Sequence, residues 1–298
     1  MTPVVNVPDV ALIFEGGGMR AAYTSAVVVE LLKAGLVFPF VAGISAGASN
    51  TANYLAGDGP RAKASFTTFA ADPRFGGLGT FVRGQGFFNA DYIYQHTSAP
   101  DEALPYDFDR FVAHPAEMSL TAFRCRDGAT VRWSKRDIGT MGDLMVRVQA
   151  SSTMPVLMPP VTIDDEVYVD GALGESGGIA LDAARAAGYT KFFVVLTQER
   201  GYIKAPMKYP RFYQAHFRRM PAVADALLTR PARYNATREE LFELERSGDA
   251  YLFVPDHMPI SNSERHVDAL ERAHALGLEQ ARREVPAWRE YLDVPAGD

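Results

Sequence analysis

The sequence predicts an α/β protein with a mostly parallel central sheet. Three observations support this class: short apolar runs alternate with stretches of helical pattern, two early runs end in glycine-rich turns, and 47% of the 298 residues are apolar. Alternating strands and helices imply parallel strands joined by right-handed crossovers. The apolar fraction is sufficient for a buried core and excludes a disordered chain.

The N-terminal elements follow one another as strand, turn, helix, strand, turn and helix. Residues 10–15 (VALIFE) are an apolar run typical of a buried strand, and three glycines follow it at 16–18. A mostly apolar helical stretch covers residues 19–34. A second apolar run at 38–42 ends in the residues GISAG at 43–47, after which small residues favour another helix. This order is the repeating unit of an α/β sheet.

The rest of the chain predicts shorter elements and a helical C-terminal part. An Asp-Gly pair at 127–128 is a hairpin signal. No linker is visible, so we expect a single domain over residues 1–298 with a helical extension from about residue 201. Strands are expected at 119–126, 130–133, 161–163, 167–169, 191–197 and 251–254, and helices from about 91 and at 141–151, 178–187, 237–247 and 264–283.

Composition excludes several classes of protein. A net charge of −6 argues against a general nucleic-acid binder. The single cysteine, Cys125, excludes an intramolecular disulfide and a metal site built from several cysteines. The chain has no run of 18 uncharged and predominantly apolar residues that could span a membrane, and the first ten residues lack the pattern of a signal peptide. We therefore expect a cytoplasmic protein, able at most to contact the inner face of a membrane.

Residues 201–235 form a basic segment. They contain seven Lys or Arg and one acid, Asp225, and aromatic residues are interleaved with the bases. Such a segment suits contact with an anionic lipid surface, as a lid or as a docking site. It equally suits solvated helices whose bases pair with acids elsewhere, and the sequence leaves both interpretations open.

Gly43-Ile44-Ser45-Ala46-Gly47 is a G-x-S-x-G motif between an apolar strand and a helix. A nucleophilic serine needs a sharp strand-to-helix turn that projects its hydroxyl, with the N-terminus of the next helix behind it. Gly43 and Gly47 remove side chains that would clash in such a turn. The alternative is a small-residue turn that packs closely against a neighbour.

The segment Gly16-Gly17-Gly18-Met19-Arg20-Ala21 has two interpretations. It matches the dinucleotide fingerprint G-x-G-x-x-A, but the next strand supplies no acid for the ribose, and Glu30 lies inside the helical stretch. Consecutive glycines at a helix N-terminus also present free N–H groups to a developing oxyanion. Because adjacent parallel strands end at the same edge, this loop and Ser45 should lie side by side.

Asp170 is the candidate base for Ser45. It ends the apolar run 167–169 and precedes Gly171, whereas the rival Asp127 is flanked by arginines in an exposed hairpin. Among six histidines, His257 is the one acceptable partner for a Ser–His–acid triad, since it follows a short strand. A carboxylate can also act as the base directly.

These motifs resemble the three signature blocks of patatin-like phospholipases. The glycine block through Arg20, the block around Ser45 and the Asp170-Gly171-Ala172 block occur in the family's order, and residues 150–155 resemble the segment upstream of the aspartate. The resemblance covers about residues 9–200, and the C-terminal part is similar to that of bacterial members with a helical tail. One departure is Ala21, where the family has a further glycine.

The resemblance implies a three-layer α/β/α fold and a Ser–Asp dyad that needs no histidine, calcium or other cofactor. Carried over by position, Ser45 is the nucleophile, Asp170 is the base and Gly16–Gly18 form the oxyanion hole. The implied activity is hydrolysis of carboxylic esters of phospholipids or lysophospholipids. Two other functions stay open: a nucleotide- or cofactor-binding protein that uses the loop at 16–21, and a non-catalytic lipid-binding module. The sequence does not indicate an oligomeric state.

Overall fold

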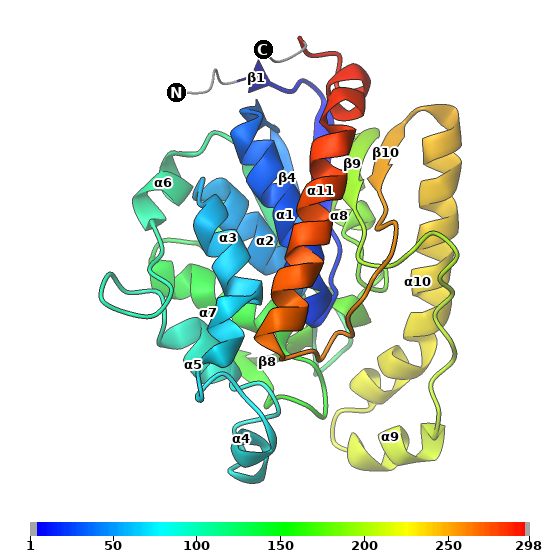
Figure 1. The fold of residues 1–298 in the computed structure, drawn as a ribbon. Coiled ribbons are helices and arrows are strands. Elements are labelled where there is room, and N and C mark those ends of the chain that lie inside the picture. Colours follow the sequence, from blue (N-terminus) through cyan, green and yellow to red (C-terminus); the bar gives the residue numbers. More distant parts are fainter. Residues whose placement is uncertain (1–4, 296–298) are drawn as a thin grey trace.

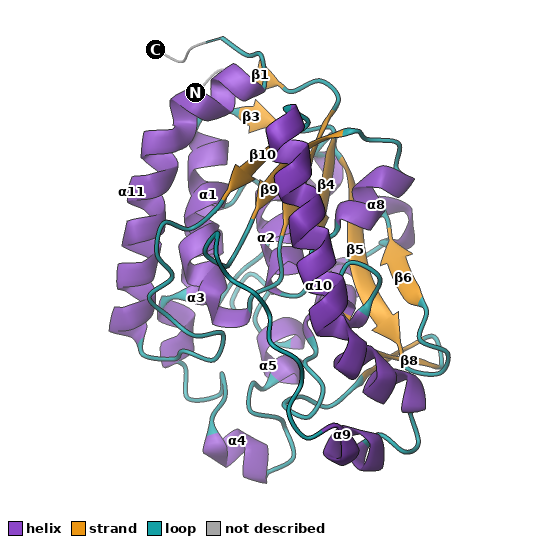
Figure 2. Ribbon diagram, turned by 90° about the vertical axis from the view of Figure 1, so that its right-hand side faces the viewer, coloured by secondary structure: helices purple, strands orange, loops and turns teal. Residues whose placement is uncertain are grey.

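The computed structural model describes residues 5–295 and has a central sheet covered by helices on both faces (Figures 1 and 2). The order of the sheet is β10-β9-β2-β4-β5-β8-β7, with β6 added to β5, and β1 pairs with β3 separately. The strands are β1 (Val5–Asn6), β2 (Val10–Phe14), β3 (Leu36–Val37), β4 (Phe40–Gly43), β5 (Glu117–Arg124), β6 (Thr130–Trp133), β7 (Val161–Ile163), β8 (Glu166–Asp170), β9 (Lys191–Val195) and β10 (Ala250–Phe253).

The sheet is mostly parallel, which confirms the fold class. The neighbours β10, β9, β2, β4 and β5 all run in the same direction. β6 and β8 are antiparallel to β5, and β7 is antiparallel to β8. The predicted hairpin around Asp127 joins β5 to β6, and the expected strand pair at 161–169 is β7 with β8.

Alternating residues of the strands divide the core into two layers. Leu12 and Phe14 of β2 belong to a cluster that includes side chains of α1, α2, α7 and α11, whereas Ala11 and Ile13 pack with α8 and α10. The molecule is therefore an α/β/α sandwich. The α-helices are α1 (Ala21–Lys33), α2 (Ala46–Leu55), α3 (Gly59–Phe66), α4 (Leu78–Val82), α5 (Ala90–Gln95), α6 (Phe108–Ala113), α7 (Met141–Ser152), α8 (Leu181–Ala186), α9 (Pro210–His216), α10 (Pro221–Ser247) and α11 (Val267–Tyr291).

Some helix boundaries differ from the predicted ones. α10 begins at Pro221 rather than near residue 237 and continues through Pro231, which is buried within it. α3, which the sequence analysis did not predict, begins directly after Asp58. The Asp58 carboxylate accepts a hydrogen bond from the N–H of Arg61 at 2.8 Å, and Pro60 suits a first helical turn. α8 is shorter than expected, and α11 is shifted toward the C-terminus.

The sheet brings the ends of β4 and β8 together from opposite directions. Leu120 of β5 pairs with Gly43 of β4 on one side and with β6 on the other, and two residues further on, Ala122 pairs with Asp170 of β8. Since β6 occupies one side of β5, β4 and β8 share the other side and meet with their carboxyl ends facing. The two ends are about 7 Å apart along β5.

None of the helices within residues 5–295 has the length and apolar character required to cross a membrane.

Candidate active site

Ser45 lies at a strained turn between β4 and α2. Its backbone angles are φ 58° and ψ −126°, a region that residues with a side chain rarely adopt. A Cβ added to Gly43 would lie 2.1 Å from the carbonyl oxygen of Gly47, and one added to Gly47 would lie 2.1 Å from that of Phe14. The turn therefore requires both glycines of the G-x-S-x-G motif, and it places Ser45 at the N-terminus of α2.

The glycine loop packs directly against this turn. A Cβ on Gly16 would lie 3.0 Å from the Cβ of Ser45, as expected for turns that follow the adjacent parallel strands β2 and β4. The Gly16 N–H already donates to the carbonyl of Gly178 at 3.0 Å. Among the described residues, the N–H groups of Gly17 and Gly18 have no acceptor. These two amides, rather than that of Gly16, are free to bind a ligand oxygen.

The Asp170 carboxyl is buried beside Ser45. Burial raises its pKa above the ordinary value of an aspartate, while the charge of Arg230, the N–H of Ala172 and the Ser45 hydroxyl each act to lower it. Ala172 donates its N–H to Asp170 Oδ1 at 2.8 Å. Gly171 allows this close turn, since a Cβ there would lie 2.1 Å from the carbonyl oxygen of Thr121. A buried carboxylate with a raised pKa is a stronger base than an exposed one.

The C-terminal end of α7 positions both Ser45 and Asp170, a role that the sequence motifs did not reveal. The Ser151 hydroxyl accepts the N–H of Ser45 at 3.0 Å. The carbonyl of Thr153 accepts the N–H of Asp170 at 2.8 Å. The signal in the sequence is the segment at 150–155, which resembles the family's segment upstream of the aspartate.

The histidines and the rival aspartate lie elsewhere. Among the described residues, no histidine makes a hydrogen bond to Ser45 or Asp170; His257 is exposed and its Nδ1 lies 3.0 Å from Glu199 Oε1. The Asp127 carboxylate is bound by Arg124 in the exposed β5–β6 hairpin, with 2.6 Å between Oδ2 and Nη2. Of the candidate bases that the sequence offers, Asp170 is the one that lies beside Ser45.

Three cations gather beside the glycine loop. Burial, together with the positive charges of Arg230 and Arg20, lowers the pKa of Lys204 to about 8. The Nε of Arg230 donates to the carbonyl of Gly177 at 3.0 Å, and the buried Nε of Arg20 has no acceptor among the described residues. α10 and the segment before α9 therefore bring positive charge to the site from outside the three motifs.

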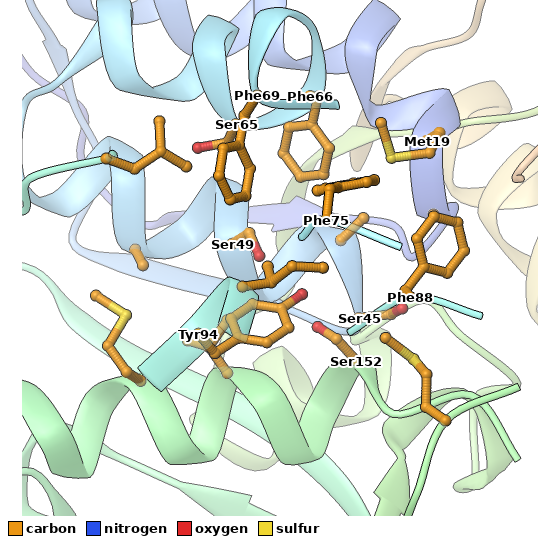
Figure 3. A pocket seen from close by; sticks show the side chains of 18 of the residues that line it. Met19, Ser45, Ser49, Ser65, Phe66, Phe69, Phe75, Phe88, Tyr94 and Ser152 are labelled. Atoms are coloured by element: carbon orange, nitrogen blue, oxygen red, sulfur yellow. The ribbon is translucent and has the colours of Figure 1, made fainter. Parts of the chain in front are cut away.

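An apolar cavity extends from Ser45 (Figure 3). The close-up shows Ser45 at its edge, with Tyr94, Ser49 and Ser152 beside it and phenylalanine rings on the opposite wall. Tyr94 is half-buried, desolvation raises the pKa of its hydroxyl, and that hydroxyl interacts with Ser152 and Ser49. The apolar lining comes from Met19, Phe66, Phe69, Phe75, Phe88, Ile93, Leu104, Met145, Val148, Met154 and Met158.

Residues 5–295 were expected to hold neither a cysteine-based metal site nor the acid of a dinucleotide site, and the side chains there can be compared with both expectations. Residues 5–295 include no group of three or more His, Cys, Asp or Glu side chains that could hold a metal. Glu30 is buried on α1 and paired with Arg282 at 3.0 Å, so it is not at the end of a strand where a ribose could reach it.

Comparison with known proteins gives two family matches. Residues 12–182 match the patatin-like phospholipase family, and residues 220–293 match a domain of unknown function, DUF6363. No curated protein matches the chain.

Two similar solved structures are VipD from Legionella pneumophila and human GIVD cytosolic phospholipase A2. VipD is 14% identical with a TM-score of 0.48, and the match covers 96% of this chain and 67% of VipD. The human enzyme is 12% identical with a TM-score of 0.48, and the match covers 96% of this chain and 60% of the human chain. Because the family match spans more than half of the sequence and contains the turn at Ser45 and the loop beside it, the chain belongs to the patatin-like phospholipase family and is a lipid hydrolase.

Proposed function

We propose that this protein hydrolyses carboxylic esters of phospholipids or lysophospholipids through a Ser45–Asp170 dyad. The observation that carries the proposal is the juxtaposition at the meeting point of β4 and β8. There, a serine on a strained turn lies beside a buried carboxyl of raised pKa.

In the proposed mechanism, Asp170 accepts the hydroxyl proton of Ser45 while Oγ attacks the ester carbonyl carbon. The N–H groups of Gly17 and Gly18 bind the oxyanion that develops. Asp170 then gives its proton to the leaving alcohol as the acyl–oxygen bond breaks. A water molecule, deprotonated by Asp170, attacks the acyl-enzyme, and proton return to Ser45 releases the fatty acid.

Two features support the substrate class. The cavity beside Ser45 suits an acyl chain, since most of its lining is phenylalanine, methionine and aliphatic side chains. The cations Arg20, Lys204 and Arg230 beside the glycine loop suit the phosphate of a head group, because charge-assisted hydrogen bonds to phosphate are strong.

The first prediction tests the dyad. Ser45→Ala should remove turnover of a short p-nitrophenyl ester and labelling by a fluorophosphonate probe. Asp170→Asn should lower kcat at least about 100-fold, because a positioned general base contributes that much or more. The matched controls Asp127→Asn and His257→Ala change an exposed aspartate and an exposed histidine, and both should retain most of the turnover.

Circular dichroism on each variant verifies that it is folded. An active Asp170→Asn with an inactive, folded His257→Ala would replace the dyad by a Ser–His mechanism. A wild-type protein that neither turns over ester nor labels would instead indicate a non-catalytic lipid-binding module or a cofactor-binding protein.

A further inference from the structure

Two short helices carry most of the large apolar side chains that this molecule exposes. Among the described residues, five of the nine exposed large hydrophobic side chains lie on α4, on α9 or directly before α9. Figures 1 and 2 place α4 and α9 at the same lower end of the molecule, with a gap between them. The five residues, with their exposed fractions, are Leu78 (77%), Phe81 (45%), Val82 (84%), Tyr209 (76%) and Phe212 (53%).

α4 projects directly from the wall of the catalytic cavity. Phe75 and Phe88, at the two ends of the segment that carries α4, both line the cavity beside Ser45. These ends are joined where the N–H of Asn89 donates to the carbonyl of Phe75 at 2.9 Å. Leu78 and Val82, one helical turn apart, point their side chains into solvent on one face. A surface bound to the face of α4 that carries Leu78 and Val82 would therefore lie next to the cavity.

The two segments are also basic in an acidic protein. Residues 73–90 and 201–224 contain seven Lys or Arg and no Asp or Glu, although the whole chain has a net charge of −6. Among the described residues, the exposed side chains of Lys208, Arg211, Arg218 and Arg219 make no ion pair. Apolar side chains surrounded by unpaired bases are complementary to an anionic lipid surface rather than to water.

We propose that α4 and α9 together form a docking face for anionic membranes, which seats the mouth of the Ser45 cavity against the bilayer. The apolar tips of both helices enter the interface while the bases of residues 201–224 contact anionic head groups. This proposal rests on the proposed function for its purpose, but docking itself does not require hydrolysis.

The test measures binding of the full chain to vesicles of ether-linked phosphatidylcholine, with and without ether-linked phosphatidylglycerol, lipids that the enzyme cannot hydrolyse. Binding should require the anionic lipid and weaken as salt is added. Leu78→Gln with Val82→Gln should weaken binding about tenfold. Lys208→Gln with Arg211→Gln should weaken it roughly fivefold per base removed.

The controls are exposed residues on other elements. Val112→Gln with Leu276→Gln removes apolar side chains from α6 and α11, and Arg136→Gln with Arg272→Gln removes exposed bases, so both pairs should bind as the wild type does. Turnover of the soluble p-nitrophenyl ester should stay within about twofold in all variants, which separates docking from catalysis.

Equal vesicle binding by the test and control pairs would overturn the proposal. The proposal would also be overturned if the variant Leu78→Gln with Val82→Gln bound vesicles normally but no longer self-associated. The exposed face of α4 would then bind a second copy of this chain. The α4 variant could lose ester turnover through damage to the cavity wall. In that case vesicle binding by Lys208→Gln with Arg211→Gln decides whether the proposal holds, because neither residue lines the cavity.

Discussion

At the scale of single residues, the candidate site depends on the absence of side chains. The turn at Ser45 brings backbones of three elements so close that a Cβ on Gly43, Gly47 or Gly171 would approach a carbonyl oxygen to 2.1 Å. These glycines are required for packing space, and their φ values are not in the left-handed region. The strain sits instead on Ser45, whose positive φ turns its side chain out of the strand.

A substitution tests this packing requirement. Gly43→Ala should destabilise the protein by about 3 kcal/mol or more and remove ester turnover, because neither the Gly47 carbonyl nor α2 can move away without opening the turn. Urea unfolding and the p-nitrophenyl ester assay measure the two effects. Gly201→Ala is the control, since nothing lies within 4 Å of an added Cβ there. A wild-type midpoint and turnover in Gly43→Ala would contradict the requirement.

At the scale of elements, the contact between α1 and α11 contains a buried titratable group. His274 of α11 is buried against α1, where its Nδ1 lies 3.0 Å from Ser25 Oγ and 3.1 Å from the carbonyl oxygen of Ala22. Burial lowers its pKa below the ordinary value, and Lys63 acts in the same direction, while the Ala22 carbonyl and Glu271 oppose it. The neutral form is therefore the one that fits the folded protein.

This contact predicts a pH dependence of stability. Below about pH 6.5 the unfolded chain binds a proton at His274 that the native state does not, so the free energy of unfolding should fall as the pH is lowered, by at most about 1.4 kcal/mol per pH unit for this group. His274→Asn keeps an N–H donor without titrating in this range. Its urea midpoint should depend less on pH between 7.5 and 5.5 than that of the wild type.

The control is His257→Asn, which changes an exposed histidine and should leave the pH dependence unaltered. An identical pH dependence in wild type and His274→Asn would show that the contact of α1 with α11 does not carry the effect.

At the scale of the whole molecule, we propose that the C-terminal part folds with the core as one domain. β10 extends the sheet by pairing with β9. Trp288 of α11 is fully buried, and its ring packs against Phe193 of β9 and Phe253 of β10. α10 supplies Tyr234, whose hydroxyl donates to the buried Glu15 carboxylate at 2.6 Å. Both faces of the sheet thus depend on residues beyond 200.

A chain truncated after residue 200 tests whether the C-terminal part and the core form one domain. Residues 1–200 alone expose the edge of β9 and the apolar face of α1, so they should not give a cooperative thermal transition or a near-ultraviolet circular dichroism signal. Full-length protein treated identically is the control. A cooperative transition within about 5 °C of the full chain, with retained ester turnover, would instead make residues 201–298 a separable domain.

What the sequence determined by itself is local. Short apolar runs followed by glycines predicted β2, β4 and their turns, Asp127-Gly128 predicted the β5–β6 hairpin, and the motifs predicted the family to which the chain belongs. These features depend on periodicity and on backbone conformations that few residues allow, so neighbouring residues encode them. The start of α10 was missed because Pro231 predicts a break that tertiary packing overrides.

What the tertiary structure alone decided is which distant residues meet. The facing ends of β4 and β8, the hold of Ser151 and Thr153 on both site residues, and the approach of Arg230 to Asp170 all join segments far apart in the chain. The tertiary structure also brings α4 and α9, more than a hundred residues apart in sequence, to the same end of the molecule. Such pairings depend on strand register and on the burial of whole faces of the sheet and helices. A short sequence pattern does not encode either of them.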